Sequence, residues 1–211
     1  MVAVANLVES GSFRIDSQSK VQGDAVDLLK RVKAITLGKF TLSNGGESDY
    51  YFDSKQLTLD PEGAEFVASQ LLRKIEEENI EVVGGTAYSA IPIVSHICLY
   101  SKIYGKKPVS AFYHRKELKG HGPDNQVVDG KLPAKGTRVA IVEDVVTSGG
   151  SLIQAIERAE NDGCRVTNAI VLVDREEGGR EKVEQRGYKF WALFTVCRNM
   201  NGELWFRFNG V

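Results

Sequence analysis

Apolar positions along the chain recur at two different periods, which predict alternating strands and helices. Short apolar runs rich in β-branched residues are typical of buried strands, and they occupy 80–83, 109–113, 138–142 and 166–173. Between them, apolar residues recur at helical spacing in 61–75, 91–104 and 151–162. Strands that are apolar at nearly every position lie in parallel sheets covered by helices on both faces. The sequence therefore predicts an α/β fold with a parallel sheet flanked by helices.

Polar residues and glycines mark where these elements begin and end. Asp60-Pro61-Glu62 is typical of a helix start, because Asp caps free N–H groups and Pro fits the first turn. Gly163 lies just past the helix predicted at 151–162. Upstream, a helical pattern that begins at Asp24 predicts a helix extending to Gly38, which occupies the place of a stop signal.

Three segments stand outside the alternation. Residues 39–53 predict two short strands around the turn Asn44-Gly45, and 190–208 also has strand-like patterning. We expect such strands to build a small hood over the sheet edge, placed at about 21–60 within a single domain of residues 21–211. Residues 1–20 are mixed in pattern and are expected to form a loosely held N-terminal arm without an assigned function.

Composition argues against several classes of partner. The chain has 27 Lys and Arg against 28 Asp and Glu, a net charge of -1, so no global field attracts nucleic acid or an anionic membrane. Its three cysteines are far apart and suit a reducing compartment. No signal peptide is recognisable, and no window approaches the roughly 18 apolar residues of a membrane span. We expect a cytoplasmic protein that binds neither nucleic acid nor membrane.

One strand, predicted at 139–142, runs into two acids and then into a turn of small residues. Ligands of open α/β sheets bind at the carboxyl ends of strands, so this turn faces the expected crevice. Its backbone N–H groups, the hydroxyls of Thr147, Ser148 and Ser151, and the following helix N-terminus all favour a phosphate. Glu143 and Asp144 would repel that phosphate, so we expect them to contact ribose hydroxyls or hydrated Mg²⁺.

Taken alone, Thr-Ser-Gly-Gly could also be a tight turn with capping hydroxyls. The longer string, apolar strand, paired acids and T-S-G-G-S, resembles the phosphoribosyl pyrophosphate (PRPP) motif of the type I phosphoribosyltransferases. No Walker-type or dinucleotide-binding glycine loop competes with it. The resemblance implies the fold of that family, Mg²⁺ as cofactor, a catalytic role for Asp144, and a set of PRPP-binding residues. These are Glu143, Asp144, Val145, Val146, Thr147, Ser148, Gly149, Gly150 and Ser151, with Tyr88 and Ser89 of a second strand-end turn.

A long basic connection occupies about 114–137. Compact domains seldom keep a connection beyond about 12–15 residues without a purpose, and a mobile lid is the natural one. Its cations and histidines can neutralise pyrophosphate, and Gly120 and Gly122 permit hinge motion. A solvated charged loop is the alternative. A metal site at His114, Glu117 and His121 is disfavoured, because nearby Gly and Pro residues undermine fixed ligand geometry.

The string R-K-E-x-K-x-H-G in this loop resembles the flexible catalytic loop of orotate phosphoribosyltransferases. The resemblance implies catalytic and PRPP-binding roles for Arg115, Lys116, Lys119 and His121. In that family the loop closes over the active site of the neighbouring subunit. A homodimer with shared sites is therefore implied.

Two further segments resemble the orotate pocket of that family. The string Ser48–Asp53 is similar to its aromatic pair, which implies that Tyr51 and Phe52 lie against the pyrimidine ring, with Thr147 nearby. The strand-end Asp-Arg implies that Arg175 faces the orotate carboxylate, and a planar guanidinium suits that role. Without the family, the aromatic pair would be hairpin core and Arg175 a surface charge. Ser43 and Ser89 depart from the pattern, because lysine is common at both positions.

The implied reaction is attack of N1 of orotate on C1′ of PRPP, which yields orotidine 5′-monophosphate and pyrophosphate. A purine phosphoribosyltransferase would share the PRPP motif but has no need of Arg175 or of the basic loop string. A PRPP-binding regulator without turnover would carry a basic DNA-binding appendage, whereas the N-terminal arm holds only Arg14 and Lys20. Both remain alternatives.

Overall fold

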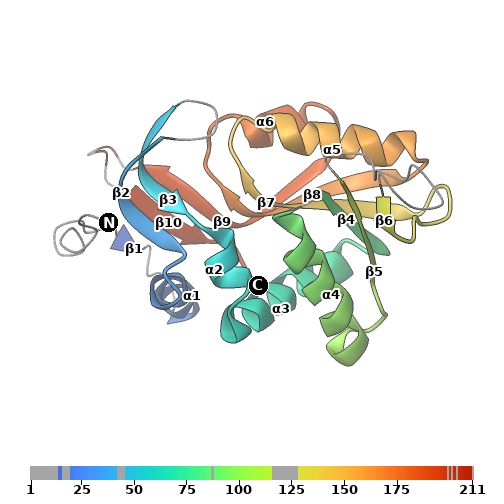
Figure 1. The fold of residues 1–211 in the computed structure, drawn as a ribbon, viewed down its shortest axis with the longest axis horizontal. Helices are drawn as coiled ribbons and strands as arrows, with labels where there is room; N and C mark the ends of the chain where they lie inside the picture. The colour runs from blue at the N-terminus through green and yellow to red at the C-terminus, as the bar shows by residue number, and fades with distance from the viewer. Residues whose placement is uncertain are drawn as a thin grey trace.

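The protein is described by a computed structural model covering residues 14–15, 20–41, 46–86, 88–115, 128–198, 200, 202 and 204–210. Its centre is an eight-stranded sheet in the order β1-β10-β9-β8-β7-β4-β5-β6 (Figure 1). The strands are β1 (Arg14–Ile15), β4 (Val82–Thr86), β5 (Ser110–His114), β6 (Val128–Gly130), β7 (Arg138–Val146), β8 (Arg165–Asp174), β9 (Lys189–Arg198) and β10 (Leu204–Phe208). Parallel ladders join β5, β4, β7, β8 and β9, as the apolar runs predicted.

Helices cover both faces of the sheet, which confirms the predicted α/β fold. In Figure 1, α5 (Gly150–Asn161) and α6 (Gly179–Glu184) lie on one face. On the other lie α1 (Lys20–Arg31), α2 (Ser54–Thr58), α3 (Pro61–Glu77) and α4 (Ala90–Tyr104). Each face has its own apolar core, one that includes Leu71, Ile93 and Leu172 and one that includes Ile156 and Val171. None of the described helices is long and apolar enough to cross a membrane.

The start of α3 follows the predicted signal. The Asp60 side chain accepts a hydrogen bond from the N–H of Gly63 at 2.9 Å, and Pro61 occupies the first turn. Its carboxylate satisfies a donor that the helix itself leaves free.

The predicted helix from Asp24 to Gly38 is wrong at its end. Helix α1 stops at Arg31, because Lys33 takes a left-handed conformation with φ of 56°. The N–H of Ala34 then bonds the carbonyl of Leu29, which closes the helix as a C-terminal cap with lysine in place of the usual glycine. Gly38 lies instead within a strand, β2 (Ile35–Thr41), at an irregularity in its pairing with β3 (Glu47–Phe52).

The hairpin of β2 and β3 is a separate two-stranded antiparallel sheet, as predicted for 39–53, and its turn lies outside the described residues. The expectation that 190–208 would also join a hood is wrong. Strand β9 pairs in parallel with β8, and β10 pairs antiparallel with β9, so both extend the main sheet. From the N-terminal arm, Arg14 and Ile15 pair with β10, and the rest of 1–19 lies outside the described residues.

Candidate active site

The two acids that end the apolar run of β7 lie among hydroxyls from three other segments. Thr86, the last residue of β4, donates to Glu143 Oε2 at 2.8 Å, and Ser89 donates to Oε1 at 3.4 Å. Ser54, at the start of α2, donates to Asp144 Oδ2 at 2.7 Å. Because α2 directly follows β3, this last bond fixes the end of the hairpin beside the carboxyl edge of the main sheet.

Burial makes Glu143 a weaker acid than an ordinary glutamate. Only 5% of its surface is exposed, and this desolvation, with the adjacent charge of Asp144, raises its pKa from 4.5 to about 7. Hydrogen bonds from Thr86 and from the N–H of Asp144 act in the opposite direction, since they favour the ionised form. Near neutral pH the carboxyl therefore exchanges a proton readily.

A stability measurement tests this assignment. The unfolded chain ionises Glu143 near its ordinary pKa of 4.5 and the folded chain near 7, so folded protein holds the extra proton between them. The free energy of unfolding should fall as pH rises through that window, by roughly 1–3 kcal/mol. Glu143→Gln should therefore be more stable than the wild type at about pH 8 and similar at about pH 5, by urea unfolding. Equal pH slopes for both proteins would contradict the raised pKa.

The predicted phosphate turn, 147–150, follows β7 and leads into α5. Gly149 has a left-handed φ of 75° and its carbonyl accepts from the N–H of Ile153 at 3.0 Å. A side chain on Gly150 would meet nothing within 4 Å, so open space lies at the helix N-terminus. The turn thus presents free space and backbone donors at the positive end of a helix, as phosphate binding requires.

Close packing against the start of α6 holds this turn in place. A Cβ at Gly179 would lie 2.4 Å from the carbonyl oxygen of Thr147, and one at Gly149 would lie 3.0 Å from Gly179 Cα. Two glycines therefore let two backbone segments touch. The side chain of Lys182, from α6, also donates to the carbonyl of Ser148.

Gly179→Ala should displace the turn, because a backbone oxygen cannot yield as a flexible side chain would. We expect a loss of about 1–3 kcal/mol in unfolding free energy, typical of overpacking, and weaker binding of phosphate at the turn. Thermal unfolding and calorimetric titration with inorganic phosphate measure the two effects. Gly150→Ala is the matched control for stability, since its Cβ meets no neighbour; an unchanged melting temperature in Gly179→Ala would contradict the packing argument.

Arg175 follows β8 and reaches towards the hairpin. Its guanidinium lies over the ring of Tyr50 at 4.5 Å, and Nη2 donates to Ser48 Oγ at 3.1 Å. Nε lies 2.9 Å from Glu177 Oε1, an ion pair without good hydrogen-bond alignment. Burial raises the pKa of Tyr50 to about 12, and the nearby Arg175 charge opposes that rise. The arginine is thus held on strand β3 rather than extended into solvent.

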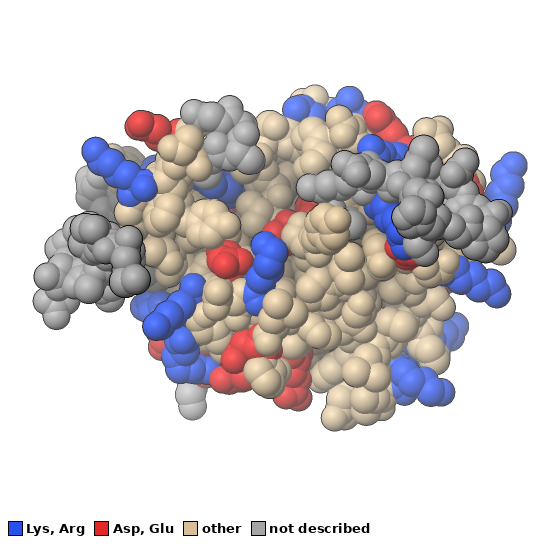
Figure 2. Space-filling view, in the orientation of Figure 1, with Lys and Arg blue, Asp and Glu red and all other residues tan. Residues whose placement is uncertain are grey.

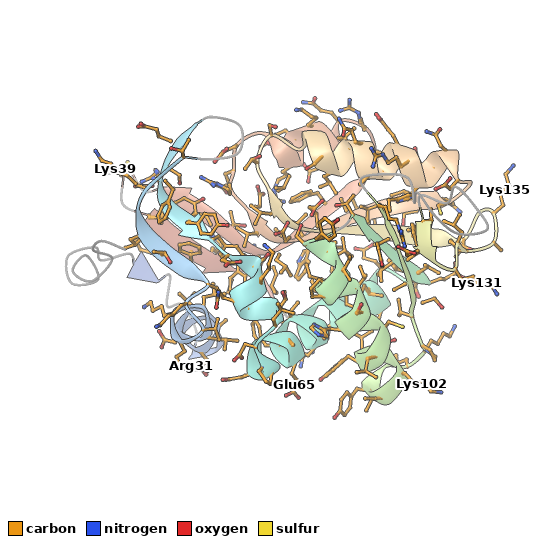
Figure 3. The ribbon with its side chains drawn as sticks, viewed as in Figure 1. Arg31, Lys39, Glu65, Lys102, Lys131 and Lys135 are labelled. Carbon is orange, nitrogen blue, oxygen red and sulfur yellow. The ribbon has the colours of Figure 1, made fainter. Side chains whose placement is uncertain are left out.

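A cavity of about 660 Å³ opens beside Arg175, between the hairpin and strands β9 and β10. Its cationic lining residues are Lys39, Arg175 and Arg198, and Figure 3 shows Lys39 projecting from the outer part of β2. Tyr50 lines this cavity, whereas Tyr51, Phe52 and Thr147 do not. The lining also carries four acids, Glu47, Asp49, Glu176 and Glu177. The volume suits a small planar ring, and a carboxylate on such a ring would need one of the three cations as its partner.

The predicted aromatic pair divides between two environments. Phe52 is 7% exposed and belongs to the apolar core, whereas Tyr51 is 45% exposed with its ring 5.6 Å from that of Phe40. Strand alternation puts Tyr50 on the same side as Phe52, so Tyr50 became the partner of Arg175. Contact of Tyr51 and Phe52 with a base stays a prediction.

Both ends of the predicted loop are described, although residues 116–127, with Lys116, Lys119 and His121, are outside the described residues. Strand β5 leads into the loop and β6 follows it, and the two strands pair antiparallel. His114 is not arranged as a metal ligand: its Nε2 lies 2.7 Å from Asp162 Oδ2 in a site 2% exposed. Among the described residues, no group of three His, Cys, Asp or Glu could hold a metal ion.

Sequence reasoning missed several residues of this site. Ser54 and Thr86 bond the acid pair, and Ser48 and Tyr50 contact Arg175. Alternation along β3 could have separated Tyr50 from Tyr51, because successive strand residues face opposite sides. No local signal identifies Ser54, which reaches Asp144 across 90 positions of sequence.

Known proteins share both the sequence and the fold. The phosphoribosyl transferase domain family matches residues 54–193. An orotate phosphoribosyltransferase of Synechocystis sp. is 44% identical over 159 residues, which cover 75% of this chain and 79% of the relative. One from Methanosphaera stadtmanae is 41% identical over 171 residues, covering 81% and 92%.

Solved structures agree. Orotate phosphoribosyltransferase from Aeropyrum pernix superposes with a TM-score of 0.67 at 34% identity, over 80% of this chain and 92% of that one. The enzyme of Mycobacterium tuberculosis in complex with PRPP has a TM-score of 0.63 at 26% identity, over 80% and 94%. With the acid pair, the phosphate turn and Arg175 gathered at one edge of such a sheet, this chain belongs to the orotate phosphoribosyltransferases of the phosphoribosyltransferase family.

Proposed function

We propose that the protein transfers the phosphoribosyl group of PRPP to N1 of orotate, releasing pyrophosphate, as a step of pyrimidine biosynthesis. The observation that carries the proposal is the meeting of the acid pair and phosphate turn of β7 with Arg175 of the adjacent strand. The acid pair and the phosphate turn suit a phosphorylated ribose, and Arg175 suits a ring that carries a carboxylate. An enzyme joining these substrates needs both.

The described residues divide the work of binding. Backbone N–H groups of 147–150 suit the 5′-phosphate, and Asp144, which is partly exposed, suits the ribose hydroxyls. The turn after β4 carries Tyr88 and Ser89 and offers donors to pyrophosphate. Holding N1 of orotate in line with C1′ lowers the entropic part of the barrier. Lys116, Lys119 and His121 would stabilise the departing pyrophosphate.

The acid pair fits a magnesium ion shared with substrate. Glu143 is occupied by Thr86 and Ser89, and Asp144 by Ser54, so these carboxylates alone do not form a cage. Mg²⁺ in phosphate-binding sites is commonly held by one or two carboxylates, water and the substrate itself. We therefore assign Asp144, and Glu143 through water, as its protein contacts. When bound, Mg²⁺ would neutralise charge on the pyrophosphate.

We further propose that the protein is a homodimer whose two subunits share their active sites, and that it is located in the cytoplasm. Large apolar side chains are exposed along α4, with Leu99 62%, Ile103 59% and Tyr104 66% exposed. Figure 2 shows a mostly uncharged surface over α4, and an exposed apolar surface of this kind suits a subunit contact. Three free cysteines, Cys98, Cys164 and Cys197, agree with a reducing compartment.

The experiment that tests the proposed reaction follows the ultraviolet absorbance of orotate with PRPP and the purified protein. Loss of orotate and appearance of orotidine monophosphate are expected only when both PRPP and Mg²⁺ are present. Chelation of Mg²⁺ should stop the reaction, and added Mg²⁺ should restore it. Orotate that persists under saturating PRPP and Mg²⁺ would contradict the proposal.

A further inference from the structure

An aspartate from one side of the basic loop holds an arginine from the other side. In the pairing of β5 with β6, Tyr113 lies opposite Asp129, and Arg115 follows β5 directly. Arg115 donates from Nε to Oδ2 and from Nη2 to Oδ1 of Asp129. Each side chain is only 26% exposed. Two parallel bonds restrain the guanidinium in both position and orientation.

This arginine lies beside the turn that we assign to pyrophosphate. Strand β5 runs parallel to β4, with His114 opposite Thr86, so Arg115 comes next to the turn carrying Tyr88. The pKa of Arg115 is raised, chiefly by its hydrogen bond to Asp129. Ser89, which follows Tyr88, bonds Glu143. Arg115 therefore lies near the turn whose Ser89 bonds the acid pair.

The pairing leaves part of the guanidinium available. Asp129 occupies the edge formed by Nε and Nη2, whereas Nη1 has no hydrogen-bond partner among the residues that the structure describes. A guanidinium has five N–H donors in a rigid fork, so one edge can be fixed by a carboxylate while another binds a second anion. Fixing the side chain beforehand removes an entropic cost from substrate binding.

We propose that Asp129 is a positioning residue that fixes Arg115 for the pyrophosphate group of PRPP. This inference rests on the proposed function. A charge argument alone gives the opposite expectation, because removing a negative charge near an anion site should strengthen anion binding. If Asp129 positions Arg115, removing Asp129 should weaken PRPP binding. If Asp129 only cancels part of the positive charge of Arg115, removing it should strengthen PRPP binding.

Asp129→Asn and Asp129→Ala test the inference. Both should raise the KM and the Kd for PRPP, by roughly two- to fivefold, the range of a partly exposed ion pair, while the KM for orotate stays unchanged. In an Arg115→Ala background the same substitutions should add nothing, since the residue that they position is gone. Glu62→Gln is the matched control: it removes the exposed pair of Glu62 with Arg31, between α3 and α1, and should leave all constants unchanged.

Calorimetric titration of the protein with PRPP, in buffer that contains Mg²⁺, gives the Kd for PRPP without requiring turnover. A lower Kd in either Asp129 variant, an unchanged Kd, or an equal rise in the Arg115→Ala background would overturn the inference. If Asp129→Ala unfolds, the nearly isosteric Asp129→Asn carries the test, with its melting temperature as the folding check. Wild-type protein that leaves orotate unconsumed defeats the proposed function instead, and the titration still decides the role of Asp129.

Discussion

Two nearly inactive variants, Lys119→Ala and Asp144→Asn, are expected to regain about a quarter of wild-type activity when refolded together. Lys119→Ala removes a cation aimed at the departing pyrophosphate, and losses of about 10²- to 10³-fold in kcat are typical for one such group. Asp144→Asn removes a charged acceptor for ribose or hydrated Mg²⁺, worth roughly tenfold or more in affinity, so it should keep about a tenth of the activity or less when PRPP is held below the wild-type KM. The amide oxygen can still accept the bond from Ser54, so the fold should persist.

The recovery follows from the geometry of shared sites. If each site combines the β7 turn of one subunit with Lys119 of the other, a mixed dimer has one intact site and one site with both defects. Random pairing makes about half of the dimers mixed, so about a quarter of sites are intact. Activity of the refolded mixture measures this fraction.

A matched pair of variants controls for refolding itself. Asp144→Asn mixed with Thr147→Ala places both defects on the β7 side, so every site in every dimer carries one defect. That mixture should be no more active than the average of the two variants refolded separately. If a verified Lys119→Ala and Asp144→Asn heterodimer also recovers nothing, while refolded wild type is fully active, the loop serves its own subunit.

Arg175→Ala should raise the KM for orotate about tenfold or more and leave the KM for PRPP nearly unchanged. The Arg175 side chain is only 9% exposed, with its guanidinium over the ring of Tyr50, and truncating one side of a charge-assisted pair costs about 1.5–3 kcal/mol. Steady-state rates at varied orotate measure the change. Arg175→Lys should lie between, because an ammonium keeps the charge but loses the planar fork.

Arg180→Ala provides the contrast for this prediction. Its Nε bonds the fully buried Asp174 at 3.0 Å, so its loss should lower stability without changing the KM for orotate. Orotate binding that survives Arg175→Ala would remove the carboxylate role from this residue.

Local sequence signals predicted most of the helices and strands. The cap at Asp60, the apolar runs of β7 and β8 and the glycine after α5 each depend on neighbours within a few positions, and each prediction is confirmed. The end of α1 was missed because Lys33 adopts a left-handed conformation, which in most helix ends is adopted by glycine and is therefore predicted from glycine. Strand β9 was misplaced because joining β8 depends on a distant partner, which strand propensity does not specify.

The same distinction applies to the site. Glu143, Asp144 and the turn after them are contiguous, so their pattern is visible in one string. The contact of Arg175 with Tyr50 joins β8 to the hairpin, and the pair of Arg115 with Asp129 closes a long loop. Such contacts depend on topology, which a single sequence pattern does not encode.

The most direct test of the central claim is a panel of bases assayed with PRPP and Mg²⁺ by release of pyrophosphate. Orotate should be consumed with a far higher kcat/KM than adenine, hypoxanthine or uracil, because none of these three carries a carboxylate for Arg175. Uracil is the sharpest comparison, since it is orotate without the carboxylate. Equal turnover of a purine, or PRPP binding without turnover of any base, would contradict the account.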